Sequence, residues 1–140
     1  MKRAIYMLPI LLGCVACENP QRRETESLSR ALERFRLAED ADQAREAKNL
    51  ESLTVTDAEV TRVKRTCVDA AKDSTDGMAL VAEAKPLVAK VSLGALAKDS
   101  PEALALGPKL DRADALLRKG KDEMTRCDSE ISALKRKVGL

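Results

Sequence analysis

The apolar positions after residue 25 predict a first helix. Leu28, Leu32 and Phe35 recur at helical spacing, and neither Pro nor Gly interrupts residues 28–53. After Phe35 an apolar residue occurs at every third position. Because a helix has 3.6 residues per turn, such residues move gradually around the helix and do not stay on one face. We therefore expect the second half of this helix to pack loosely or to bend.

Two helical stretches are predicted in the middle of the chain. Thr56-Asp57-Ala58-Glu59 has the form of a capping box, which predicts a helix start at Thr56. The stripe of this helix is Val60, Val63, Cys67 and Ala70. The turn-forming run Asp73-Ser74-Thr75-Asp76-Gly77 should end it. Residues 78–97 then form a third stretch, which Pro86 should kink or restart.

The last helix carries the strongest periodic signal. Ser100-Pro101 resembles an N-cap followed by Pro, and Gly107-Pro108 should end that short piece and start the next. From there the apolar and small residues alternate steps of three and four, which is a heptad-like seam. They are Leu110, Ala113, Leu117, Gly120, Met124, Cys127, Ile131, Leu134 and Val138. Gly120 should destabilise the interior of this helix unless a close contact with another helix requires a glycine there.

Composition supports an all-α fold. The 140 residues contain many Ala, Leu, Glu, Lys and Arg, while aromatic residues make up only 1% of the chain. We expect one domain, an elongated three- or four-helix bundle with a long C-terminal helix. Lys2 and Arg3 account for the formal charge of +2, so the remaining chain is neutral and a nucleic-acid partner is not expected.

The N-terminus has the form of a secretory signal peptide. Met1-Lys2-Arg3 precedes an apolar run from Ala4 to Leu12, which is too short for an ordinary membrane-spanning helix. Leu11-Leu12-Gly13-Cys14 and Cys14-Val15-Ala16-Cys17 both resemble the lipobox of bacterial lipoproteins. The resemblance covers about the first 17 residues and implies cleavage before a cysteine that becomes acylated.

Cys14 is the expected site of that acylation, and Cys17 is the alternative. Leu-Leu-Gly-Cys fits the lipobox pattern at Cys14, so residues 1–13 would be removed. Cleavage before Cys17, which removes residues 1–16, would instead leave an even pair of cysteines in the rest of the chain. The residue after the acylated cysteine is Val15 or Glu18 rather than Asp. The resemblance therefore implies an outer-membrane lipoprotein that faces the periplasm.

The segment behind the anchor predicts a tether. Residues 18–24 contain Asn19, Pro20 and two Arg but no apolar side chain to bury. We therefore expect residues 14–24 to form the lipid anchor and a flexible tether, and residues 25–140 to form the helical domain.

Cys67 and Cys127 lie on the apolar stripes of their own predicted helices, so folding should bring both into one interior. An exported protein meets an oxidising compartment, where such a pair forms a disulfide. In a reducing compartment they would instead be buried thiols, which behave as small apolar residues.

Candidate chemistry is sparse. The chain has no His, which removes the commonest general base and metal ligand, and its six glycines form no phosphate-binding loop. We expect no catalysis, cofactor or metal. The expected role is a helical interaction or structural module on the membrane, with another envelope protein or self-association through the C-terminal helix as partner. The alternative is a binder of a small apolar ligand.

Overall fold

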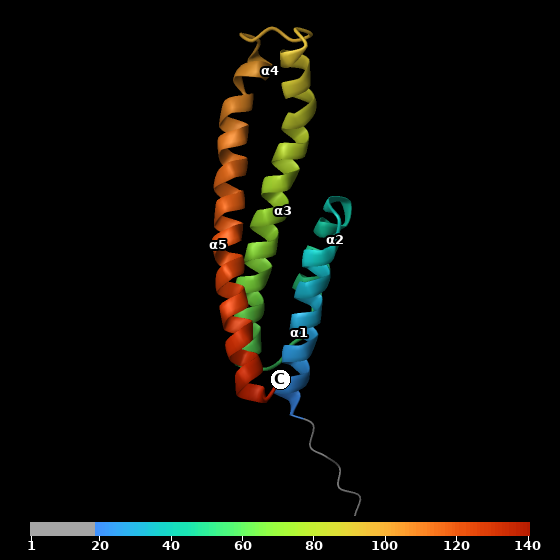
Figure 1. The fold of residues 1–140 in the computed structure, drawn as a ribbon, viewed down its shortest axis with the longest axis vertical. Coiled ribbons are helices and arrows are strands. Elements are labelled where there is room, and N and C mark those ends of the chain that lie inside the picture. The colour runs from blue at the N-terminus through green and yellow to red at the C-terminus, as the bar shows by residue number, and fades with distance from the viewer. Residues whose placement is uncertain (1–18) are drawn as a thin grey trace, which may run out of the picture.

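The computed structural model describes residues 19–140, and within them it contains only helices (Figure 1). The helices are α1 (Pro20–Leu37), α2 (Asp40–Ser52), α3 (Ala58–Ser92), the short α4 (Pro101–Leu104) and α5 (Leu106–Val138). The prediction of an all-α fold with a long C-terminal helix is confirmed. The predicted signal peptide, Cys14 and Cys17 lie outside the described residues.

Two helical hairpins make up the molecule. α3 has 35 residues and α5 has 33, so each is about 50 Å long at 1.5 Å per residue. They run side by side, and α4 lies at their turn. The shorter hairpin of α1 and α2 packs against them but reaches only part of the way up (Figure 1). We call residues 79–115, the part of α3–α5 toward the turn, the upper hairpin.

The main core lies where all four longer helices meet. Its buried side chains lie on the inward stripe of each helix, and all but one of them are aliphatic or small. They include Leu28, Leu32, Phe35, Leu50, Val60, Val63, Ile131 and Leu134. Phe35 is the single aromatic side chain among them, so the packing depends on interdigitated aliphatic residues.

The register of α3 against α5 is fixed by three contacts. The Cα atoms of Cys67 and Cys127 are 5.0 Å apart. Seven residues further along α3, Ser74 lies against Gly120, which is seven residues back along α5. Three more residues bring Gly77 against Leu117. α3 and α5 therefore form one antiparallel coiled coil, and the heptad-like seam of α5 is used within the chain.

The predicted helix end at Asp73–Gly77 is wrong, because α3 continues through it to Ser92. Ser74 Oγ donates to the carbonyl of Ala70 at 2.8 Å, and Thr75 Oγ1 donates to that of Lys72 at 3.0 Å, so both hydroxyls bond within the helix. Gly77 is buried against α5 rather than placed in a turn. Pro86 does not restart the helix either, since α3 is continuous across it.

The first predicted helix is divided in two. Ala38 and Glu39 have extended backbone angles, with ψ of 139° and 157°, and the chain reverses there between α1 and α2. The step-of-three pattern after Phe35 therefore belongs to a separate helix that packs on a different neighbour, α3. Leu50 is the one fully buried side chain of α2.

The predicted tether over residues 14–24 and the domain start at Thr25 also need correction. α1 begins at Pro20, with Asn19 as its N-cap: the Asn19 side chain accepts a hydrogen bond of 3.0 Å from the Gln21 amide. Proline at the first helical position loses no hydrogen bond and has a φ suited to a helix. The helical domain therefore includes residues 20–24.

The helix start predicted at Thr56 lies one residue later. Asp57 is the N-cap of α3, and its Oδ1 accepts from the amides of Glu59 at 2.9 Å and Val60 at 3.0 Å. Thr56 is instead held by Glu24 of α1, which accepts from its hydroxyl at 2.6 Å and from its amide at 3.0 Å. A side chain from another helix thus replaces the expected capping box.

Candidate functional site

The upper hairpin exposes large apolar side chains. Val81 and Val88 of α3 and Leu110 of α5 lie along the seam, yet each is about two-fifths exposed. Leu93 and Leu104 flank the turn between α3 and α5 and are 84% and 65% exposed. Clustered apolar side chains of this kind mark an interaction site more often than isolated apolar residues do. The cluster is interrupted by the exposed Lys85, which lies between Val81 and Val88 on the same side of α3.

A second apolar stripe follows α3 beside this seam. Val68, Thr75 and Ala79 of α3 line the groove that faces α2. At helical spacing the same stripe continues beyond α2. Its members there are Ala79, Ala82, Pro86, Ala89 and Leu93, all of them exposed. We call these five residues with Val81, Val88 and Leu110 the upper face.

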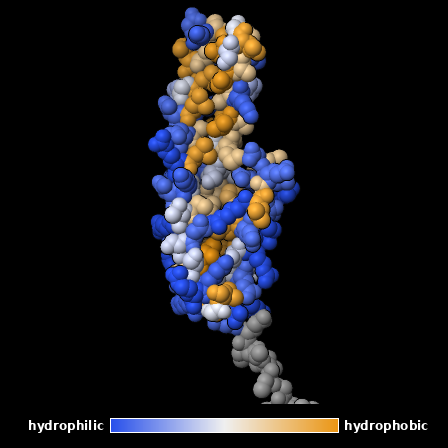
Figure 2. Space-filling model, viewed as in Figure 1, coloured by the Kyte–Doolittle hydropathy of each residue, from blue (hydrophilic) through white to orange (hydrophobic). Residues whose placement is uncertain are grey.

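Figure 2 shows this arrangement on the surface. Apolar side chains run along the middle of the upper part of the molecule, down to the level at which α2 begins to cover α3. Charged side chains border them. Lys109 Nζ pairs with Glu83 at 3.0 Å across the two helices.

A groove between α2 and α3 is the second candidate site. It has a volume of about 230 Å³ and an apolar floor that includes Ala44, Ala47 and Val68. Lys48, Lys72 and Asp76 are exposed at its rim. Such a groove could accept a short apolar chain with a polar end, although its walls cover only one side of a ligand.

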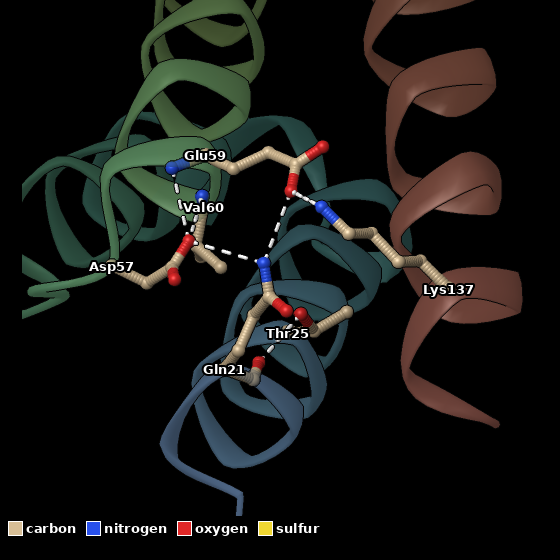
Figure 3. Close-up of polar contacts among 6 residues, drawn as sticks. All are labelled: Gln21, Thr25, Asp57, Glu59, Val60 and Lys137. Carbon is tan, nitrogen blue, oxygen red and sulfur yellow. Dashed lines mark hydrogen bonds and ion pairs between the residues drawn. The ribbon is translucent and has the colours of Figure 1, made fainter.

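A polar cluster closes the opposite end of the molecule, where α1 and α3 begin and α5 ends (Figure 3). Gln21 Nε2 donates to Glu59 Oε2 at 3.0 Å and to Asp57 Oδ1 at 3.4 Å. Lys137 of α5 also contacts Glu59 Oε2. The hydrogen bond and charge of Lys137 hold the pKa of the Glu59 carboxyl below its usual range. The cluster ties the first turn of α1 to both long helices.

Thr25 completes this end of the molecule. It is 1% exposed, and its hydroxyl donates to the Gln21 carbonyl at 2.7 Å, so the buried polar group is satisfied. These side chains are hydrogen-bonded to one another rather than directed into a cavity, and their arrangement is structural.

The predicted disulfide residues do come together. The Sγ atoms of Cys67 and Cys127 lie 2.03 Å apart, at bonding distance, and both side chains are fully buried. Cys14 and Cys17, the predicted lipidation residues, lie outside the described part of the chain. Within residues 19–140 no three His, Cys, Asp or Glu side chains gather as a metal site.

None of the helices in the described part is both long and apolar enough to cross a membrane. Comparison with known proteins adds no relative, because no protein-family model, no curated protein and no solved structure matches this chain.

Proposed function

We propose that this protein is a lipid-anchored component of the bacterial cell envelope whose helical domain has an interaction or structural role and no catalytic one. The basic, apolar and lipobox-like segments before residue 18 support export and acylation at Cys14 or Cys17. We place the protein in the outer membrane, facing the periplasm, because no Asp follows either cysteine.

The early start of α1 is the observation that carries this proposal furthest. Pro20 is six residues after Cys14 and three after Cys17. A chain spans at most about 3.5 Å per residue, so the acylated cysteine would lie within about 20 Å or about 10 Å of the helical domain. A domain held this close to a membrane is positioned by its anchor rather than free on a long tether.

The polar cluster at the base gives this attachment a structural basis. Gln21, one residue into α1, bonds to two side chains of α3, and one of them also bonds to Lys137 of α5. The end of the domain nearest the anchor is therefore fixed to both long helices. The Cys67–Cys127 pair also suits an exported protein, since disulfides persist in oxidising compartments.

The mass of the intact protein extracted from membranes tests the anchor. We expect the residues before the acylated cysteine to be absent, several acyl chains to be present, and a gain of two protons on reduction of the disulfide. Cys14→Ser and Cys17→Ser form a matched pair, of which one should lose both the acyl chains and the membrane fraction. A wild-type protein that retains residues 1–13 and carries no acyl chain would overturn the proposal.

A second candidate function is the binding of a small apolar ligand, which the groove between α2 and α3 favours. A fluorescent fatty-acid probe should then bind saturably. Ala44→Trp, which fills the groove, should abolish that binding, whereas Asn49→Trp, at an exposed position of α2 that points away from the groove, should leave it intact. Binding that is unsaturable, or equal in both variants, would dismiss this function.

A further inference from the structure

We propose that the groove between α2 and α3 binds an amphiphile with one acyl chain and an anionic head group, which is the chemistry of a fatty acid or an anionic lysophospholipid. This inference rests on the second candidate function proposed above and names the class of its ligand. It starts from the extent of the groove, which continues below the hollow already described.

A second hollow extends the groove toward the base of the molecule, where α3 begins. It has a volume of about 200 Å³, and it shares Glu51 of α2 and Val68 of α3 with the hollow above it. The residues of α3 that line the two hollows run from Thr61 to Ala79, which is about 27 Å of helix at 1.5 Å per residue. Together the two hollows fall within the range of volumes typical of ligand sites, about 300–1,000 Å³.

Basic side chains outnumber acidic ones along this groove. The chain beyond Arg3 has equal numbers of basic and acidic residues, so an excess of either kind is local. A local excess of positive charge attracts an anion. The charged lining residues are the basic Lys48, Lys64, Arg65 and Lys72 and the acidic Glu51 and Asp76.

Arg65 is the cation best placed to bind an anionic group. Arg62, one turn earlier on α3, pairs with Glu130 at 3.1 Å, whereas Arg65 has no ion pair with any residue of the described chain. The neighbouring Lys64 Nζ donates to the carbonyls of Glu51 and Leu53, and these bonds hold it at the end of α2. The guanidinium of Arg65 is therefore free, and its planar donors match the two oxygens of a carboxylate or phosphate.

The upper hollow suits the acyl chain of such a ligand. Its floor is apolar and includes Ala44, Ala47 and Val68. The hydrocarbon core of a bilayer is about 30 Å thick, so one acyl chain is about 15 Å long. From Arg65 to Ala79 the helix rises about 21 Å, which is enough for one chain with its head group at Arg65.

Two lysines flank the upper hollow from opposite helices. Lys48 of α2 and Lys72 of α3 are exposed at its rim, and neither has an ion pair with a described residue. A lysine stem covers apolar surface while its ammonium group stays in water. The two stems can therefore cover the side of the chain that the groove leaves open, and their charges add to the preference for an anion.

Photocrosslinking of the full chain in isolated membranes tests the class of ligand. Two probes share one acyl chain that carries a diazirine near its middle, and they differ only in the head, which is a free carboxylate in one and its methyl ester in the other. We expect the acid to form several-fold more adduct than the ester on the residues of the upper hollow, as mapped by peptide mass spectrometry. Excess unlabelled fatty acid or anionic lysophospholipid should compete, and the one that competes at the lower concentration identifies the preferred source.

A variant of Arg65 tests the role of the head group. Arg65→Gln should lower the adduct of the acid several-fold, to the level of the ester, and Arg65→Lys should restore part of it. Arg112→Gln is the matched control, because Arg112 is exposed on α5 outside the groove and also has no ion pair with a described residue. This control should label like the wild type.

The outcomes separate this inference from the functions on which it rests. Equal yields of groove adduct from acid and ester, unchanged by Arg65→Gln, would overturn the anionic ligand and leave the binding of an apolar ligand standing. The absence of any adduct in the groove would overturn both. The mass of the protein in the same sample reports its acylation, so neither result bears on the lipid anchor.

Discussion

Gly120 of α5 lies against Ser74 of α3 with no room for a side chain between the two helices. A Cβ atom on Gly120 would lie 2.5 Å from Ser74 Oγ, 2.9 Å from Ser74 N and 3.1 Å from the Ala70 carbonyl oxygen. The Ser74 hydroxyl cannot move away at no cost, because it donates to that same carbonyl. Gly120 is therefore required by the approach of the two helices, which accounts for a glycine in the middle of a 33-residue helix.

Gly120→Ala should destabilise the protein by up to about 2 kcal/mol. The new methyl group overpacks a contact that includes backbone atoms, which costs about 1–3 kcal/mol. The gain of about 1 kcal/mol that Ala brings to a helix interior offsets part of that cost. Urea unfolding at neutral pH measures the difference.

Gly107→Ala is the matched control near the start of the same helix, where a Cβ would meet nothing within 4 Å. We expect this variant to be unchanged or more stable by up to about 1 kcal/mol. Equal effects of the two substitutions would show that the Ser74 contact does not constrain Gly120.

The same contact shows what the sequence could and could not predict. The all-α fold and the last helix followed from periodicity, because the seam of α5 is regular from Leu110 to Val138. The turn predicted at Asp73–Gly77 failed because local composition was outweighed by tertiary packing: Ser74 and Gly77 continue the seam of α3 and give α5 room to approach. A search for seven-residue steps from Cys67 through Ser74 to Val81 could have found this.

Two other features could not be predicted by examining each helix separately. Residues 18–24 contain no apolar side chain and therefore predict a tether, although a capping Asn before Pro is also the start of a helix. The upper face could not be predicted because Ala82, Pro86 and Ala89 resemble an ordinary helix surface until the end of α2 is known. The disulfide residues were found because both lie on seams that the sequence displays.

Replacing both Cys67 and Cys127 by Ala should lower the free energy of unfolding by about 4 kcal/mol. The bond closes a loop across a sequence separation of 60 residues, and the entropy of that loop sets the magnitude. Thermal unfolding with and without a reductant tests this. The double variant should match the reduced wild type and be insensitive to reductant, whereas a wild type that reductant leaves unchanged would count against the bond.

Glu24→Gln should destabilise the protein by about 1 kcal/mol, which is typical of a lost helix cap. The hydrogen bond from the Thr56 hydroxyl, with those from the Asp57 and Thr56 amides, holds the pKa of the Glu24 carboxyl below its ordinary value of 4.5. Its contribution is therefore present above about pH 4.5 and is lost as the pH falls through the lowered pKa. Unfolding curves of wild type and variant should converge at acid pH.

Glu26→Gln serves as the control for that experiment. Glu26 lies on the same helix and pairs with Arg22 and Arg30 at the surface. Exposed pairs of this kind contribute well under 1 kcal/mol, so the variant should differ little from wild type at any pH. A loss as large as that of Glu24→Gln would mean that charge on α1, and not the contact with Thr56, is responsible.

Glu123→Gln should make the protein more stable at neutral pH. Burial raises the pKa of the Glu123 carboxyl, and the neighbouring charge of Asp73 raises it further, although Lys119 at 3.7 Å acts in the opposite direction. Glu123 Oε2 is also buried and accepts no hydrogen bond from the residues that the structure describes. The folded state therefore disfavours the ionised carboxylate, which reduces stability at any pH above the ordinary value of 4.5.

Glu130→Gln is the counterpart two turns further along α5, and its effect should have the opposite sign. Burial raises the pKa of Glu130, but hydrogen bonds from Thr66, Arg126 and Arg62 outweigh burial and hold that pKa below its ordinary value. Arg62 lies 3.1 Å away, and Arg126 lies 3.3 Å away. At pH 7 we expect Glu123→Gln to unfold at a higher temperature than wild type and Glu130→Gln at a lower one. Both differences should shrink below about pH 4.5, and two variants that shift in the same direction at pH 7 would contradict the opposed roles of the two carboxylates.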